Sequence, residues 1–485
     1  MDKKEEYIAV VANLLSGSEL KLVKAFGYKS LLINSNTWIS MEKALEADVP
    51  VEVNLNNEEE LMEKVQELRK KYDIKAVFSL NEYRVPIAAK IREFLGLPYG
   101  IPYKAAINCR NKKMTRKILE ELGEEAVKYA IIQNVEEALN FVKDNGLPVV
   151  IKPSNDAGSQ LVFCCKTSAE VEEAVASVMS TENNLVDQKL DAEFLIEEFL
   201  DGPEFSVESI AYNGKVSVVA ITAKKLLSPF KPIEVGHTVP ALLSPQEEQA
   251  IKNLVEKANE LLGIDYTVTH TEVKLTQKGP RIVEVNARPG GDNIPLLVEA
   301  VKGIDLYETM VAFSLGREAH YKASCTSKAD IRYFIAEHDG YAHFKDMTPL
   351  YKNEKVKTVN LSVSDGKEVT RSTSNYDRMG YFLCYDEEDT YIEEMAGLIE
   401  VTDKSGDSLS EKAEEEQNDN LDELFKKFCD NEVLEKNISD REYAIALLVR
   451  AFSACDHYKK IRAVIYAKSV GITTEEIIYI YSIIK

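Results

Sequence analysis

The chain has 485 residues, of which 45% are hydrophobic and 29% are charged. This length accommodates about three domains, and the composition is typical of a globular protein. Its 59 basic residues against 81 acidic ones give a formal net charge of -22. Nucleic acids and anionic membranes bind basic surfaces, so this charge argues against both as general partners. It leaves room for one local basic pocket that binds a nucleotide.

The cysteines and the N-terminus indicate the compartment. The seven cysteines form no CxxC pair and no zinc-binding spacing, so we expect reduced thiols. The N-terminal apolar run is short, with no small-residue cleavage site after it, and no run in the chain approaches the roughly 20 residues that span a bilayer. We therefore expect a cytoplasmic protein.

Residues 1–107 alternate between predicted strands and helices. The strands are expected at 7–11, 28–33 and 74–80, and the helices up to residue 26 and at 58–72 and 85–95. This βαβ rhythm predicts a parallel sheet with helical crossovers, and therefore an α/β domain.

Residues 108–320 have a different pattern. Helices are expected at 111–122, 135–145 and 245–262, and strands at 148–152, 194–199, 205–212, 215–223, 268–275 and 281–286. Asn213-Gly214 and the segment 277–280 are turn sequences between successive strands, which makes these pairs antiparallel. We expect α+β subdomains here.

The remaining residues divide into three pieces. Residues 321–400 read as a β-rich lobe, with strands at 331–336, 356–363 and 380–385. Residues 401–420 contain seven acids against two lysines and almost no large apolar residue, which predicts a flexible linker. Residues 421–485 read as a small helical domain, with capping-box spacings at Ser439…Glu442 and Thr473…Glu476. This domain is a candidate interaction or homodimerisation element.

Two predicted strands carry oxygen ligands suited to a metal ion. Glu272 lies in the first, and Glu284 and Asn286 lie two residues apart on its hairpin partner, so the latter two point to one face. Two carboxylates and an amide oxygen suit Mg²⁺, or Mn²⁺ in its place, bridging nucleotide phosphates. Arg288 follows on the same strand as a candidate phosphate ligand. The alternative is a solvated strand of alternating charge, which the Pro289–Gly291 turn makes less favourable.

Two further segments suit a nucleotide. Lys152 ends a strand and is followed by a loop of small residues whose main-chain N–H groups could cover a triphosphate. The acid-rich strand end FLIEEFLDGPEF offers backbone to an adenine edge, and Glu204 offers an acceptor to a ribose hydroxyl. The chain has neither a Walker A loop nor a G-x-G-x-x-G fingerprint. The loop residues expected at the nucleotide are Ser154, Gly158, Ser159 and Gln160.

The order of these motifs resembles that of the ATP-grasp superfamily, over about 101–316 and more loosely over 1–400. The resemblance implies an α/β and α+β multidomain fold: a pre-ATP-grasp Rossmann-like domain, two ATP-grasp subdomains and a β-rich C-terminal lobe, here with a small helical domain appended. Asn111 stands where the family usually has an acid. The residues to which the resemblance gives roles are Lys112 and Lys152 at the phosphates and adenine, Glu197, Glu198, Phe199 and Leu200 as the adenine hinge, Glu204 at the ribose, and Glu272, Glu284 and Asn286 as Mg²⁺ ligands.

The resemblance also implies a reaction. A carboxylate attacks the γ-phosphate of ATP, and a nucleophile then displaces phosphate from the acyl phosphate. The protein would neutralise charge and position groups, with Lys152 and Arg288 among the catalytic residues. This makes the chain an expected carboxylate–amine ligase with ATP and Mg²⁺ as cofactors and small molecules as substrates.

The substrate residues are expected in three places. His237, read as an exposed loop histidine, could position or deprotonate the amine. Its segment G-H-x-x-P-A resembles the L-amino acid ligases, which make dipeptides, but a loop histidine without a role is the alternative. Glu82 follows a parallel strand, at the end where open sheets bind ligands, and by resemblance would hold a substrate ammonium group; a surface acid is the alternative. Asp292, next to Gly291, would favour a substrate with an amine or a basic side chain. Dipeptide ligases often have a bulkier residue there, which leaves the substrate open.

Two other functions stay open at this stage. Residues 406–409 read Gly-Asp-Ser-Leu, as in the phosphopantetheine sites of carrier proteins, which suggests a ligase that loads an acid onto a carrier or another nucleophile. However, no apolar helix precedes them. The second alternative is a non-catalytic nucleotide sensor or scaffold, against which the complete set of metal and phosphate ligands argues.

Overall fold

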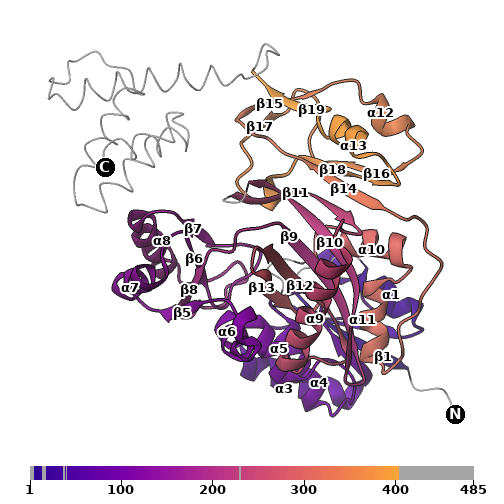
Figure 1. Ribbon diagram of the computed structural model, residues 1–485. Helices are drawn as coiled ribbons and strands as arrows, with labels where there is room; N and C mark the ends of the chain where they lie inside the picture. Colours follow the sequence, from indigo (N-terminus) through magenta and orange to yellow (C-terminus); the bar gives the residue numbers. More distant parts are fainter. Residues whose placement is uncertain (1–4, 14–17, 36–38, 40, 229–230, 404–485) are drawn as a thin grey trace, which may run out of the picture. The chain divides into compact units, whose positions relative to one another are not determined.

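The computed structural model describes residues 5–13, 18–35, 39, 41–228 and 231–403 (Figure 1). The chain divides into two compact units, of which the first comprises Met1–Glu337, Phe344–Ser364 and Arg371–Ile399. Most of the predicted linker 401–420, the carrier-like motif at 406–409 and the helical domain 421–485 lie outside the described residues. Val401 and Thr402, assigned to the linker, instead belong to a strand.

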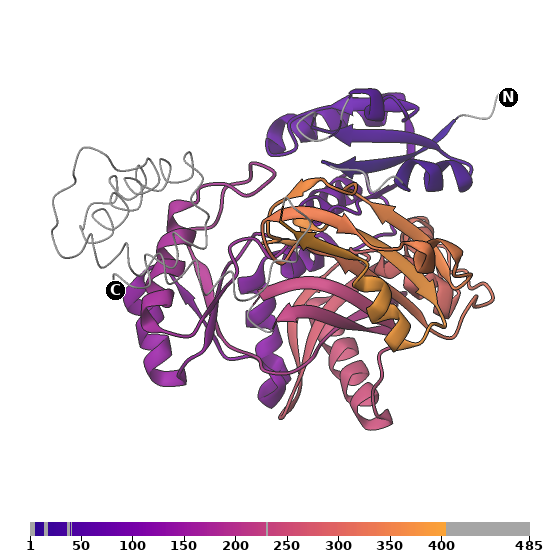
Figure 2. The same ribbon diagram turned by 90° about the horizontal axis from the view of Figure 1, so that it is seen from above.

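The first hundred residues form the predicted parallel sheet, in the order β3-β2-β1-β4. Ile8 and Val10 of β1 pack toward α1, whereas Ala9 and Val11 pack toward α3 and α4, because alternate residues of a strand face opposite sides. Figure 2 shows this part in indigo. Two short elements, β3 and α2, were not predicted. The elements are β1 (Glu6–Ala12), α1 (Glu19–Ala25), β2 (Lys29–Asn34), α2 (Met41–Ala44), β3 (Val49–Glu52), α3 (Glu58–Lys71), β4 (Asp73–Phe78) and α4 (Val85–Phe94).

A small antiparallel sheet follows, in the order β5-β8-β6-β7. The helices α7 and α8 pack on one of its faces through a single apolar cluster (Figure 1). The Asn111 side chain caps α6 by accepting from the N–H groups of Lys113 and Met114, and the predicted helix 111–122 continues past α6 as a 3₁₀ segment. The elements are α5 (Tyr103–Arg110), α6 (Lys112–Leu119), η1 (Glu120–Glu125), β5 (Tyr129–Ile132), α7 (Val135–Asn145), β6 (Val149–Pro153), β7 (Phe163–Cys165), α8 (Ser168–Ser180) and β8 (Phe194–Glu198).

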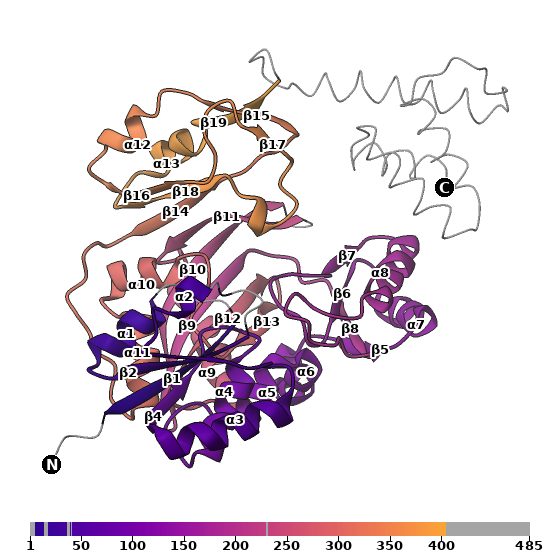
Figure 3. The ribbon, with the colours of Figure 1, turned by 180° about the vertical axis from the view of Figure 1, so that it is seen from behind.

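The largest sheet is antiparallel and runs β13-β12-β9-β10-β11-β14-β18-β16 (Figure 3). One face packs against α9, and the other against α10 and α11. Strands from the predicted C-terminal lobe therefore extend the sheet that carries the predicted metal ligands. The elements are β9 (Glu204–Tyr212), β10 (Lys215–Ser228), β11 (Lys231–Val239), α9 (Pro245–Leu262), β12 (Thr267–Thr276), β13 (Gly279–Asn286), α10 (Ile294–Lys302), α11 (Leu306–Ser314), β14 (Ala329–Phe334), β16 (Val356–Leu361) and β18 (Gly380–Tyr385).

Three further elements belong to the first unit and were not predicted: α12 (Thr348–Lys352), η2 (Asn375–Asp377) and α13 (Asp389–Ala396). The second unit contains a three-stranded sheet in the order β17-β15-β19, with β15 (Gly340–Phe344), β17 (Glu368–Val369) and β19 (Ile399–Thr402). Among the described residues, no helix is both long enough and apolar enough to cross a membrane.

Candidate active site

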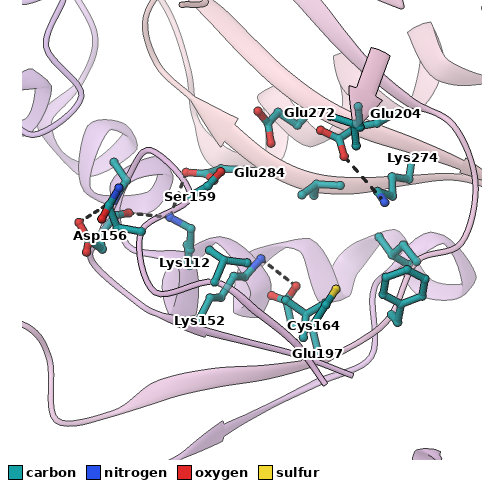
Figure 4. A pocket seen from close by; sticks show the side chains of 18 of the residues that line it. Lys112, Lys152, Asp156, Ser159, Cys164, Glu197, Glu204, Glu272, Lys274 and Glu284 are labelled. Atoms are coloured by element: carbon teal, nitrogen blue, oxygen red, sulfur yellow. Dashed lines mark hydrogen bonds and ion pairs between the residues drawn. The ribbon is translucent and has the colours of Figure 1, made fainter. Parts of the chain in front are cut away.

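A pocket lies between the small sheet and the large sheet (Figure 4). β6, β7 and β8 contribute from one side, and β9 to β13 contribute from the other. Lys152 and Glu197 therefore come from one sheet, and Glu204, Glu272 and Glu284 from the other. Of the predicted nucleotide and metal residues, the pocket is lined by Lys112, Lys152, Ser159, Gln160, Glu197, Glu198, Phe199, Leu200, Glu204, Glu272 and Glu284.

One end of the pocket rests on a buried ion-pair network. Glu197 contacts Lys152 at 2.8 Å and binds Arg116 through two hydrogen bonds of 2.7 and 2.9 Å. Burial alone would raise the pKa of Glu197, but the two cations outweigh it and lower the pKa to about 2. The Glu197 side chain is thus committed to these two cations and is not available to a ligand in the pocket.

The loop after β6 lies over the pocket as predicted, but its residues differ in role. The Lys112 ammonium donates to the carbonyl of Asp156 at 2.7 Å and lies 3.0 Å from Glu284. Ser154 faces away from the pocket, because its buried hydroxyl donates to Asp191 at 2.7 Å. Gly158 has a φ of 68°, which turns the loop without the strain that a side chain would bring.

The predicted metal ligands meet on one hairpin. Glu272 and Glu284 are directly paired across β12 and β13, and both line the pocket. Asn286 lies behind them, outside the pocket lining. With its nitrogen turned toward the carboxylates, its amide donates to Glu284 at 3.3 Å and to Glu82 at 3.0 Å. The two carboxylates could hold a divalent cation, whereas the Asn286 amide links Glu284 to Glu82, a predicted substrate residue.

The sequence did not indicate Lys224, which lies among three carboxylates on the large-sheet side of the pocket. Its ammonium contacts Glu204 at 2.6 Å, Glu234 at 2.7 Å and Glu272 at 3.0 Å. Burial alone would lower the pKa of Lys224, but the three carboxylates raise it well above its ordinary value. Lys224 therefore stays protonated and holds the three carboxylates together. Lys224 reaches these carboxylates because β10 pairs with β11, where Lys224 lies opposite His237, and the sequence does not reveal this strand pairing.

His237 was predicted on an exposed loop, and this prediction was wrong. It lies on β11 between β10 and β14 and is fully buried. Its Nε2 is 3.4 Å from Asp292 and 3.5 Å from Glu234. Burial would lower the pKa of His237, but hydrogen bonds to these two acids raise it. The segment was misread because its glycine and proline suggest a loop, yet strands on both sides satisfy its backbone.

The turn after β13 brings the remaining substrate residues together. Arg288 Nε contacts Glu82 at 2.9 Å, which joins the turn after β4 to the turn after β13. Gly290 permits a close approach, since a Cβ there would lie 2.7 Å from the His270 ring. Gly291 and Asp292, the other predicted substrate residues, come directly after Gly290 in this turn.

Asp292 is not the free acid that the sequence suggested. Arg378 binds it through two hydrogen bonds of 2.6 and 2.7 Å, and the guanidinium lies 3.8 Å from the centre of the Tyr333 ring. A basic substrate side chain would have to compete with this arginine. Arg378 was missed because it lies far along the chain, on a segment with no motif.

Comparisons with known proteins agree with this geometry. A family model described as an ATP-grasp domain matches residues 145–295. The chain is 26% identical over 306 residues to the alanine–anticapsin ligase of Bacillus subtilis (strain 168), covering 59% of this chain and 64% of that protein. It is also 26% identical over 333 residues to an uncharacterized protein of Sinorhizobium fredii, covering 68% of each. The match thus spans less than two thirds of the anticapsin ligase.

Two solved structures share the fold. The L-amino acid ligase from Bacillus licheniformis has a TM-score of 0.65 at 23% identity, with 83% of this chain and 99% of that chain covered. The phosphoribosylglycinamide synthetase from Anaerococcus prevotii has a TM-score of 0.60 at 18% identity, with 83% and 100% covered.

Proposed function

We propose that this chain, an ATP-grasp enzyme, joins the carboxylate of an amino acid to an amine through an acyl phosphate, releasing ADP and phosphate. The chain contains an ATP-grasp domain, and its named relatives include the alanine–anticapsin ligases and D-alanine–D-alanine ligases. By their names, these relatives join alanine to anticapsin and D-alanine to D-alanine, which supports an amino acid as a substrate here.

The observation that carries the proposal is the arrangement of opposite charges in one pocket. Lys112 and Lys152 lie on the side of the small sheet, and Glu272 and Glu284 lie on the large sheet. A nucleotide polyphosphate with its metal ion needs such a set, because cations neutralise the phosphates and carboxylates hold the metal. A pocket for a neutral ligand would need neither.

The residues present fit a divalent cation. Two carboxylates on paired strands face the same pocket, and hard oxygen ligands of this kind suit Mg²⁺. Glu272 and Glu284 would hold it, and Asn286 could join them only if its amide turned its oxygen toward the ion. When bound, the ion would polarise the phosphoryl oxygens and neutralise charge on them.

The remaining work falls to side chains of the chain itself. Lys152 and Lys112 would draw the phosphates toward the loop after β6. Arg288 would orient the reacting carboxylate, and Glu82 would hold the ammonium group of the same amino acid, since the two already lie 2.9 Å apart. His237 is buried behind Asp292 and Glu234. We therefore assign it the role of orienting these two carboxylates rather than of contacting the amine.

The test is turnover of Mg²⁺-ATP with pairs of the twenty amino acids, followed through ADP and phosphate release and through the mass of the product. A dipeptide mass with pair-dependent ADP release is expected. AMP and pyrophosphate as products would contradict the acyl-phosphate route. Intact ATP with every pair would contradict the amino acid as substrate, and bound but unconsumed ATP would favour a nucleotide sensor.

A further inference from the structure

Asp156, in the loop after β6, is held through both its side chain and its main chain. Its carboxylate is buried and accepts a hydrogen bond of 2.9 Å from the Tyr83 hydroxyl and one of 2.8 Å from the N–H of Ala157. Burial raises the pKa of Tyr83, and the neighbouring carboxylate raises it further. The phenol therefore keeps its proton at neutral pH and remains a donor.

The main chain of Asp156 is held as well. Its carbonyl accepts from Arg110 at 3.0 Å and from Lys112 at 2.7 Å. The Arg110 guanidinium in turn lies 4.8 Å from the centre of the Tyr83 ring. Tyr83 thus contacts Asp156 directly through its hydroxyl and supports Arg110 through its ring.

Tyr83 lies between the loop that lines the pocket and the Glu82–Arg288 pair. Asp156 and Ala157 line the nucleotide pocket, and so do Ser159 and Gln160 of the same loop. Tyr83 directly follows Glu82, which pairs with Arg288 at 2.9 Å. Two consecutive residues of the turn after β4 therefore contact the two halves of the site, one at the nucleotide and one at the substrate turn.

We propose that Tyr83 is a positioning residue that ties the phosphate-covering loop to the Glu82–Arg288 pair, so that nucleotide and amino acid each favour binding of the other. A ligand on Glu82 shifts the backbone that carries Tyr83, and Tyr83 transmits the shift to Asp156. The identity of the ligand at Glu82 rests on the proposed function. The contact between Tyr83 and the loop does not.

The first experiment measures the loop in the protein without nucleotide. Tyr83→Phe keeps the ring and removes only the donor, so we expect peptides covering 153–162 to exchange amide hydrogens about 10-fold faster. Tyr129→Phe is the matched control, because it also removes one tyrosine hydrogen bond, of 2.6 Å to Glu120, and neither residue lines the pocket. Asp156→Asn keeps an acceptor for Tyr83 and should show a smaller effect. Unchanged exchange in Tyr83→Phe would overturn the proposal.

The second experiment measures coupling. The Kd of a non-hydrolysable ATP analogue with Mg²⁺ is determined with and without each of the twenty amino acids. In the wild type and in Tyr129→Phe, a substrate amino acid should tighten nucleotide binding by about 10-fold, and in Tyr83→Phe by less than about 2-fold. Equal tightening in all three proteins would refute the coupling. If no amino acid tightens binding in the wild type, the substrate assignment fails, while the exchange experiment still decides the loop contact.

Discussion

Glu197 neutralises two buried cations at one end of the pocket. It is the shared partner of Arg116 and Lys152, and all three side chains are buried. Arg116 also donates to the main-chain carbonyls of Ile282 and Val283 on β13, so the same group joins the small sheet to the large one. A change at Glu197 should therefore affect both stability and nucleotide binding.

We expect Glu197→Gln to destabilise the protein by about 3 kcal/mol at neutral pH, because two buried cations lose their carboxylate. The folded pKa of Glu197, about 2, lies below its ordinary value of 4.5. The stabilisation is therefore complete above about pH 4.5 and is lost as the pH falls toward 2. Urea denaturation at pH 7 and pH 3 should show the gap between wild type and variant narrowing in acid. A gap that does not change with pH would contradict the assignment.

A change at Glu284 tests the proposed metal site. Glu284→Gln keeps the shape of the side chain but removes a charged ligand, so we expect turnover to fall at least about 100-fold and to require more Mg²⁺. ADP release against Mg²⁺ concentration is the measurement. Glu120→Gln is the control, since Glu120 is exposed and does not line the pocket. Near-normal turnover in Glu284→Gln would remove Glu284 from the metal site.

The sequence predicted the site residues whose partners lie close by in the chain. Glu272 and Glu284 were predicted because one hairpin turn brings them into register, and the structure pairs them directly. Lys224 and Arg378 were not predicted. Each meets its acidic partners only through strand order or through contacts across the fold, and neither lies in a motif. Asp292 was predicted near the substrate as an acid available to a substrate amine, but Arg378 already pairs with it, and the sequence did not reveal this partner.

Among the elements, α9 shows what local sequence determines. At its N-terminus, the Ser244 side chain accepts from the N–H of Glu247, and the Glu247 side chain accepts from the N–H of Ser244. Pro245 occupies the first position of the helix, and Gly263 ends the helix in a left-handed conformation. Its buried face packs against the large sheet, opposite α10 and α11.

We expect Ser244→Ala to destabilise the protein by about 1 kcal/mol, because the N–H of Glu247 in the first turn loses its acceptor, the Ser244 hydroxyl. The KM for ATP should not change, since Ser244 does not line the pocket. Thermal unfolding and ATP-dependent turnover check the two statements. Ser177→Ala is the control, because the half-buried Ser177 hydroxyl only donates back along α8, to the carbonyl of Glu173. Equal melting temperatures for Ser244→Ala and the wild type would contradict a stabilising cap.

Elements whose boundaries depend on distant partners were predicted less well. β11 was read as a loop because its glycine and proline suggest a break, although β10 and β14 flank it. The short helices α12 and α13 went unnoticed because each spans only a turn or two, too little for a clear period. Three strands of the parallel sheet, β1, β2 and β4, were predicted because each carries its own apolar run, whereas the four-residue β3 does not and was missed.

For the first unit as a whole, the sheet order is what the sequence could not supply. β14, β18 and β16 join the edge of β11, which brings the segment after residue 371 to the substrate turn. Arg378 and Asp292 are 86 residues apart in the chain, and their pairing follows from this topology alone. The site is thus completed by a region with no recognisable motif of its own.

A double-mutant cycle on this pair tests the arrangement. Arg378→Met leaves the Asp292 carboxylate with His237 as its nearest cation among the described residues, so we expect a loss of about 2 kcal/mol in the free energy of unfolding. Asp292→Asn together with Arg378→Met should be less harmful than the sum of the single changes, with a coupling of at least about 1 kcal/mol. Urea denaturation of the four proteins gives both values. Additive losses would mean that the pair does not hold the C-terminal strands to the substrate turn.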